Sequence, residues 1–324
     1  MYSKMFTRRR QNFIVSFLKI FRKKGSNALS SQLNTVMCDI NKGGLKMTSK
    51  IKKLYIMTDL EGVAGVINGA DWLYPAGRYY ETAKKFLTEE VNAAIRGFLD
   101  AGFEDIVVAD GHGAGAINIE LLDSRARLMR GWPVDKPYPF GMDSSYDALA
   151  YVGQHAKAGT EYSHLTHTGW FDCLDMSING LSIGEYGQGA LCAGELGIPV
   201  IFAAGEKAFA QEVNALTPHV ITAAVKEGTI GGTGDDLTAE QYKVFHEGAI
   251  HLSPIKARGL IYRQAKTAAE LFLKNPISFA PLKLSPPYTL VHKLRPYKGE
   301  PAKTLTRIHE TSVIDLFNGC GKNL

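Results

Sequence analysis

An aspartate and a glutamate stand two positions apart in the segment TDLEGVAGV, residues 58–66. They follow directly after the apolar run at residues 54–57, which is typical of a buried strand. An aspartate at this point could cap the turn that follows the strand. On an extended chain, however, side chains at i and i+2 share a face, with Cα atoms about 6.5–7 Å apart. Asp59 and Glu61 could therefore both reach one metal ion, with small glycines making room behind them.

Further carboxylates and histidines follow the other apolar runs of the chain. In chain order the residues of interest are Asp59, Glu61, Asp110, His112, His155, His164, His167 and Glu185. Imidazole and carboxylate oxygen together suit zinc, manganese or iron better than magnesium or calcium. Two carboxylates and two histidines would fill one tetrahedral site. Three carboxylates and two histidines, with one carboxylate bridging, could hold two ions about 3.5–4 Å apart.

Each of these residues also has an ordinary structural interpretation. A single histidine after a strand is more often hydrogen-bonded than a metal ligand. Asp110 could anchor the loop that follows it, or orient the imidazole of a ligand. Glu185 could be an acidic residue in the first turn of a helix. These interpretations lose weight together, because the five candidates Asp59, Glu61, His112, His155 and Glu185 all fall at predicted strand ends or element junctions.

The elements that would position these residues alternate between strand and helix. Apolar runs predict strands at 53–58, 106–110, 148–156, 198–206 and 219–225. Helical spacing predicts helices at 79–100, 185–196 and 254–274, the first two ending before Gly102 and Gly197. This alternation predicts an α/β fold with a mostly parallel sheet and helices on both faces. Functional residues gather at the C-terminal ends of the strands in such sheets.

Three segments depart from this alternation of strands and helices. Residues 176–185 predict a hairpin that turns at Asn179 and Gly180. Residues 227–247 are rich in glycine but have neither GK[ST] nor GxGxxG, so we expect a flexible surface insertion and no nucleotide site. The tail, residues 288–324, contains short strand-like runs whose arrangement the pattern does not define.

Charge divides the chain into two parts. Residues 1–50 contain eleven Lys or Arg and one acidic residue, whereas residues 51–324 contain 26 basic and 31 acidic residues. We expect a disordered, solvated N-terminal extension at 1–50, a catalytic domain at 51–324, and a working protein that begins near residue 47. A basic tail can also bind nucleic acid or anionic lipid. The apolar run at 13–21 is too short to cross a bilayer, and no secretory cleavage site follows it. We expect neither a membrane nor a nucleic-acid partner.

The four cysteines are widely separated and form no CxxC pair. A chain of 324 residues can bury a sizeable core without a disulfide framework. We therefore expect reduced thiols and a cytoplasmic location.

Six ordered segments carry a family resemblance across residues 53–275. They are KLYIMTDLEGVAGV, VADGHGAGAIN, YVGQHAKAGT, SHLTHTG, LSIGEYGQGALCAGELGIPVIFAAGE and TAAVKEG. In this order and spacing the sequence resembles the D-aminopeptidase family of dinuclear zinc peptidases, of the dipeptide-transport operon type. The tail after residue 288 matches that family poorly.

The resemblance implies two zinc ions per chain and a role for each matched residue. The implied metal ligands are Asp59, Glu61, His112, His155 and Glu185, with Asp59 at the metal-bridging position. The implied catalytic residue is His167, in LTHT, with His164 as a nearby competitor. The resemblance also implies hydrolysis of short peptides with N-terminal D-amino acids by a zinc-activated water, and a ring-like homo-oligomer.

Other functions remain open on the sequence alone. Another dinuclear-metal hydrolase, either an amidase or a phosphoesterase, would use the same ligands. A phosphoesterase would need cationic groups, and the ligand-bearing segments offer only Lys157 nearby. A non-catalytic metal-binding module would have no use for a histidine beyond the ligand set.

Overall fold

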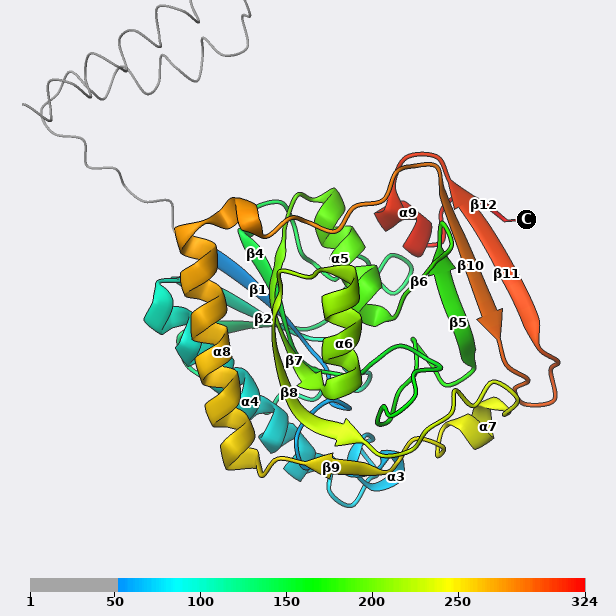
Figure 1. The fold of residues 1–324 in the computed structure, drawn as a ribbon, viewed down its shortest axis with the longest axis horizontal. Coiled ribbons are helices and arrows are strands. Elements are labelled where there is room, and N and C mark those ends of the chain that lie inside the picture. Colours follow the sequence, from blue (N-terminus) through cyan, green and yellow to red (C-terminus); the bar gives the residue numbers. More distant parts are fainter. Residues whose placement is uncertain (1–51, 324) are drawn as a thin grey trace, which may run out of the picture. The chain divides into compact units, whose positions relative to one another are not determined.

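The computed structural model describes residues 52–323, which are built around a seven-stranded sheet (Figure 1). Its strands lie in the order β3-β2-β1-β4-β7-β8-β9, and only β9 is antiparallel to its neighbour. The strands are β1 Lys53–Thr58, β2 Asp105–Asp110, β3 Ala126–Met129, β4 Ala148–Gln154, β7 Val200–Glu206, β8 Ile221–Gly228 and β9 Ala249–His251. The predicted mostly parallel sheet is confirmed.

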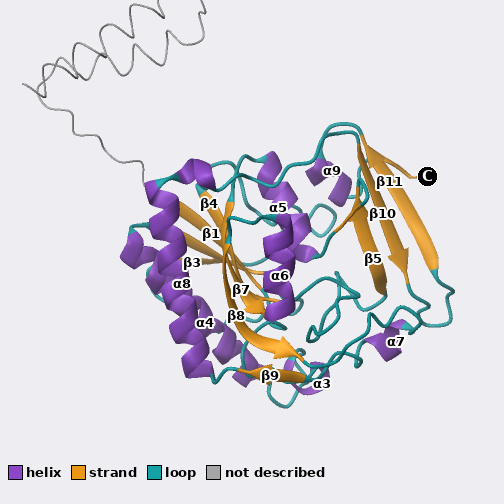
Figure 2. Cartoon of the chain, in the orientation of Figure 1, coloured by secondary structure: helices purple, strands orange, loops and turns teal. Residues whose placement is uncertain are grey.

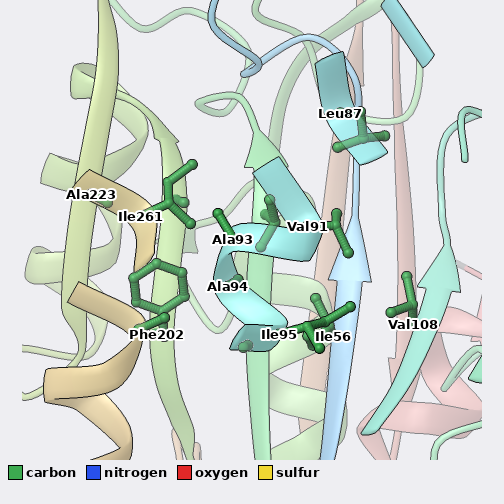
Figure 3. Packing of buried hydrophobic residues seen from close by; sticks show 14 of the residues in the cluster. Ile56, Leu87, Val91, Ala93, Ala94, Ile95, Val108, Phe202, Ala223 and Ile261 are labelled. Atoms are coloured by element: carbon green, nitrogen blue, oxygen red, sulfur yellow. The ribbon is translucent and has the colours of Figure 1, made fainter. Parts of the chain in front are cut away.

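Two long helices cover one face of this sheet. They are α4 (Tyr80–Ala101) and α8 (Pro254–Lys274), which lie against each other. Figure 3 shows Ile56 of β1, Val91 of α4 and Ile261 of α8 among the side chains of one buried cluster. The helical spacing of apolar residues in the sequence therefore corresponds to the face that each helix buries.

The opposite face of the sheet is covered by α5 (Glu185–Glu195) and α6 (Lys207–Leu216), as Figure 2 shows. Tyr55, next to Ile56 on β1, belongs to the cluster that these helices form. Successive strand residues point to opposite faces, so a strand that is apolar throughout can be buried on both sides. Helices on both faces of the sheet are thus confirmed.

A second, antiparallel sheet is formed by two separate parts of the sequence. Its order is β12-β11-β10-β5-β6, and β10 pairs with β5. The strands are β5 Cys173–Ile178, β6 Leu181–Ser182, β10 Tyr288–Leu294, β11 Lys303–His309 and β12 Lys322–Asn323. The predicted hairpin is β5-β6, and its turn has positive φ at Asn179 (51°) and Gly180 (80°). The tail supplies the remaining strands and the short helix α9 (Val313–Phe317).

Residues 227–247 pack against the rest of the protein instead of forming the flexible surface insertion that we expected. The segment contains the end of β8 and the short helix α7 (Ala239–Tyr242). Tyr242 and His246 are buried, and the Arg295 guanidinium lies 3.9 Å from the centre of the Tyr242 ring. The buried surface of this segment comes from its aromatic side chains, which a count of its glycines does not reveal.

Some predictions concern residues outside the described range. The basic extension predicted for residues 1–50 lies there, as does Cys38. Cys173, Cys192 and Cys320 are free cysteines. No helix within residues 52–323 has the length and apolar character needed to cross a bilayer. The remaining short elements are α3 (Gly69–Trp72) and the 3-10 helix η1 (Pro276–Ser278).

Candidate metal centre

The C-terminal ends of β1, β2 and β4 meet at a pocket of about 340 Å³. Five of the six predicted site residues line it, namely Asp59, Glu61, His112, His167 and Glu185. The sixth, His155, is 2% exposed and lies behind these residues, with its Nε2 atom 3.3 Å from Asp59 Oδ2. The structure therefore brings together residues that lie more than 120 positions apart in the sequence.

Asp59, Glu61 and His112 form a first group of possible metal ligands. One ligand atom from each lies within 4.8 Å of the others, and all three residues are buried. His112 Nε2 is 3.5 Å from Glu61 Oε1. The two carboxylates come from the turn after β1, which ends at Thr58, so a shared strand face does not explain their proximity. Instead, the Leu60 amide faces an oxygen of each carboxylate, Asp59 Oδ1 at 2.9 Å and Glu61 Oε2 at 3.3 Å.

His155, His167 and Glu185 form a second group with the same 4.8 Å limit. The two imidazole rings stack, with centroids 4.1 Å apart and an interplanar angle of 17°. His155 Nε2 lies 3.7 Å from Glu185 Oε1, and His167 Nε2 lies 3.8 Å from the same oxygen. Glu185 is the first residue of α5 and also accepts a hydrogen bond from the Gly169 amide.

Backbone carbonyls fix how both stacked imidazoles are oriented. His155 Nδ1 lies 2.8 Å from the carbonyl oxygen of Ala156, and His167 Nδ1 lies 3.0 Å from that of Leu165. A carbonyl can only accept a hydrogen bond, so each Nδ1 must carry the proton. The Nε2 atoms are then directed to the carboxylates and, in the neutral tautomer, present a lone pair.

Gln154 joins the two groups and was not identified from the sequence. Its side-chain amide donates to Asp59 Oδ2 at 2.8 Å and lies 3.3 Å from Glu185 Oε2, and the residue is 3% exposed. The signal that could have revealed it is its place as the last residue of β4, directly before His155. Residues at this edge of the sheet face the site whether or not they are typical metal ligands.

Close backbone packing holds the first group in place. A Cβ atom built on Gly62 would lie 2.0 Å from the Gln154 carbonyl oxygen, so only glycine fits there. The Gly62 amide donates to the Gly153 carbonyl at 2.7 Å. The buried Lys226 ammonium also donates to the backbone carbonyls of Glu61 and Val66. Gly113, in the loop that carries His112, has open space around it and is not required by close packing.

Burial and the charges of neighbouring groups strongly shift the pKa values of Asp59, Glu61 and His112. Burial, together with the neighbouring Glu61 charge, raises the pKa of Asp59 to about 7. Burial also opposes ionisation of Glu61, but the nearby His112 outweighs it and holds the Glu61 pKa well below its usual range. Burial disfavours the charged form of His112, yet Glu61 raises the pKa of that imidazole to about 9. The group is therefore arranged to hold positive charge between its carboxylates.

In the second group, too, opposite charges outweigh burial and shift the pKa values of the side chains, with His167 as the exception. Burial disfavours the ionised Glu185, but His155 and His167 lower its pKa overall. Burial also disfavours protonated His155, and Glu185 and Asp59 nevertheless raise its pKa well above the usual value. His167 differs, because burial and the adjacent His155 lower its pKa. A neutral imidazole is thus expected at His167 near pH 7.

The donor atoms of the two groups fit zinc. Nitrogen from imidazole and oxygen from carboxylate are ordinary zinc ligands, and three protein ligands leave one position open for water or substrate. His155 Nε2 is fully buried and has no hydrogen-bond partner of acceptable geometry, although carboxylate oxygens lie close to it. A metal ion would satisfy such an atom.

His164 and Asp110 have structural roles. His164 is fully buried away from the pocket lining, and its Nε2 lies 3.0 Å from the Ile67 carbonyl oxygen. Its ring packs against that of His251. Asp110 accepts hydrogen bonds from the amides of Ala116 and Ile117, which corresponds to the loop-anchoring alternative.

Comparison with known proteins gives a consistent result. Residues 52–313 match the D-aminopeptidase family of peptidases, so the match runs beyond the 53–275 expected from the motifs and includes much of the tail. A D-aminopeptidase of Bacillus subtilis (strain 168) is 33% identical over 179 residues, which are 54% of this chain. That match spans 64% of the relative's own length, slightly less than two thirds.

A solved structure shares the fold. The zinc-dependent D-aminopeptidase DppA from Bacillus subtilis, described as a self-compartmentalizing protease, superposes with a TM-score of 0.70 at 25% sequence identity. The alignment covers 82% of this chain and 95% of that structure.

Proposed function

Because the chain belongs to the D-aminopeptidase family, we propose that it is a metal-dependent aminopeptidase that cleaves short peptides, with a preference for N-terminal D-amino acids. The observation that carries this proposal is the pair of three-residue ligand groups that Gln154 joins at one pocket. The pocket volume of about 340 Å³ lies at the lower end of the range for small-molecule sites, which suits a short peptide.

We further propose two zinc ions per chain, one held mainly by Glu61 and His112 and the other by His155 and Glu185. Asp59 lies between the groups, since its Oδ2 is 3.3 Å from His155 Nε2, and it is the carboxylate we assign to both ions. When bound, zinc lowers the pKa of a water molecule toward neutrality and polarises a carbonyl oxygen. The carboxylates compensate the charge, and the backbone-anchored imidazoles fix the positions of their Nε2 atoms.

His167 is the residue that we assign to proton transfer. Its Nε2 lies beside Glu185 Oε1, its Nδ1 proton is directed to the Leu165 carbonyl, and its pKa is lowered. A neutral imidazole at the pocket wall can accept a proton at Nε2 and later donate it to the leaving amine. Its inclusion in the second ligand group raises a specific alternative, in which His167 binds metal.

The lining of the pocket favours a peptide or amide over a phosphate ester. It contains the carboxylates of Asp59, Glu61 and Glu185 but, within residues 52–323, no Lys or Arg side chain. A phosphoryl group would need cationic side chains beyond the metal ions, whereas the carbonyl of a peptide is neutral and needs none. The phosphoesterase alternative is therefore the weaker one, and amidase activity is distinguished by the choice of substrate.

The test combines metal analysis with an assay. We expect about two zinc ions per chain by elemental analysis, and faster release of D-alanine from D-Ala-D-Ala than of L-alanine from L-Ala-L-Ala. His167→Ala should lower kcat by about 100-fold or more while zinc content stays the same, because general acid–base catalysis contributes about that much. The exposed His219 provides a matched control, His219→Ala.

Three outcomes would contradict parts of this proposal. A folded, zinc-free protein that shows no peptidase activity after zinc is added would refute the function. Loss of one zinc in His167→Ala would assign that residue to metal binding. Cleavage restricted to D-alanine amide would favour the amidase alternative.

Assembly and location complete the proposal. We propose a ring-like homo-oligomer, as the description of DppA as self-compartmentalizing suggests for that protein, with light scattering as the test. We also propose a cytoplasmic location, consistent with the free cysteines, and cell fractionation tests it.

A further inference from the structure

Lys243 lies against three aromatic residues that line the pocket. Its Nζ atom is 4.6 Å from the ring centre of Tyr74, 5.6 Å from that of Trp170 and 6.0 Å from that of Phe171. Trp170 is 41% exposed, so this aromatic wall reaches the surface at the mouth of the pocket. An ammonium group near several ring faces is held by cation–π attraction and still keeps its capacity to donate hydrogen bonds.

The backbone that carries Lys243 is firmly positioned. Lys243 directly follows α7, whose first turn is closed by reciprocal hydrogen bonds between Thr238 and Gln241. The neighbouring Tyr242 is buried, and its hydroxyl accepts a hydrogen bond from the Gly159 amide at 2.7 Å. The Arg295 guanidinium stacks on the same ring. The segment at 227–247 therefore holds its lysine at a defined place.

Charge is distributed unevenly between the floor and the mouth of this pocket. The floor carries the carboxylates of Asp59, Glu61 and Glu185. Lys243 has no carboxylate partner within 4 Å among residues 52–323, so its charge is not neutralised by an ion pair there. Metal ions would compensate the carboxylates of the floor, which leaves the Lys243 ammonium available for the C-terminal carboxylate of an unblocked peptide.

We propose that Lys243 binds the C-terminal carboxylate of the peptide and thereby selects short peptides with a free C-terminus. The inference rests on the proposed peptidase function and adds a recognition group to it. The flexible four-carbon stem of a lysine lets the ammonium move from the rings to a carboxylate near the mouth. If the amine of a peptide lies at the ligand groups, its C-terminal carboxylate would lie at Lys243 only in a short peptide.

The test compares a peptide with its C-terminal amide, which differs only in the charge at that end. The zinc-loaded full chain is assayed with D-Ala-D-Ala and D-Ala-D-Ala amide, and the readout is the ratio of the two kcat/KM values. For wild-type protein we expect the free acid to be preferred. Lys243→Met should reduce this ratio by about 10- to 100-fold, mainly through KM of the acid, since that is the usual loss for a hydrogen bond to a charged group.

Matched variants separate recognition from packing. Lys243→Arg keeps the positive charge and should retain most of the preference. Lys256→Met removes an exposed lysine on α8 outside the pocket lining and should leave the ratio at its wild-type value. Melting temperatures of all variants report any loss of packing.

The possible results are distinct. An unchanged ratio in Lys243→Met, or equal losses on acid and amide, would overturn the inference while leaving the peptidase function intact. If wild-type protein cleaves neither peptide, the proposed function fails and the inference fails with it.

Discussion

Replacement of Gln154 by methionine tests whether the two ligand groups depend on each other. Methionine is close to glutamine in size and shape, so Gln154→Met removes the amide donor without opening a cavity. The side chain that is lost donates at 2.8 Å to Asp59 Oδ2 and faces Glu185 Oε2 at 3.3 Å. The first contact has ordinary hydrogen-bond length, whereas the second is long and weaker.

The magnitude follows from these two contacts. A hydrogen bond to a charged group contributes about 1.5–3 kcal/mol, and the long contact adds less, so we expect a loss of about 2–3 kcal/mol in zinc binding. Each 1.4 kcal/mol corresponds to a factor of ten, which gives roughly 30- to 140-fold weaker affinity. Partners that orient metal ligands commonly have effects of about 10–100-fold.

The assay is a competition titration of zinc against a chromophoric chelator at pH 7.5, with both the variant and wild-type protein. Gln211→Met, at an exposed position on α6, is the matched control and should keep wild-type affinity. A Gln154→Met affinity within about twofold of wild type would show that the ligand groups hold their geometry without the amide, and the reasoning would be wrong.

Four further predictions concern the same structure. Ile56→Ala should destabilise the protein by about 2–5 kcal/mol in urea unfolding, because a fully buried side chain is truncated; a loss under 1 kcal/mol would contradict the packing described. Gly62→Ala should weaken zinc binding in the same titration, because its Cβ would meet the Gln154 carbonyl; unaltered binding would contradict this. Glu90 is 1% exposed, and burial raises its pKa to about 8, so its folded pKa exceeds the unfolded one and stability is lost as pH rises from about 5 to 8. The stability of Glu90→Gln relative to wild type should therefore increase over that interval, and a constant difference in urea melts would refute it. Removal of metal with a chelator should lower the melting temperature by roughly 8–16 °C, as expected for a ligand that had been present at about 1,000 times its dissociation constant; an unchanged melting temperature would show that the folded chain does not depend on metal.

Much of the main sheet can be predicted from the sequence because its strands and helices have local signals. The strand at residues 53–58 is apolar on both faces, and the helix that ends before Gly102 has regular apolar spacing and a glycine with φ of 115° at its end. Parallel strands in an α/β fold place their C-terminal ends on one edge. The meeting of Asp59, Glu61 and His112 could therefore be predicted before any coordinate was known.

The remaining features depend on contacts between distant segments. The strand β10 pairs with β5, with Leu290 opposite Ile178, and no local pattern specifies that partner. The burial of Tyr242 depends on Arg295, which belongs to the tail. Gln154 could not be predicted as a site residue, because an amide does not bind metal as readily as imidazole. Its importance arises from the two carboxylates that folding brings beside it.

The strand order also has a consequence for the sequence of events during folding. β1 pairs with β2, the next strand of the sheet along the chain, so the first ligand group needs only one moderate loop closure. The second group requires β4 to dock on the other side of β1, and the lysine at the mouth requires the tail strand β10 and Arg295 to arrive. Loop-closure entropy rises with separation along the chain, and non-local contacts slow folding. We therefore expect the floor of the pocket to form before its mouth, where we propose that Lys243 recognises the far end of a peptide.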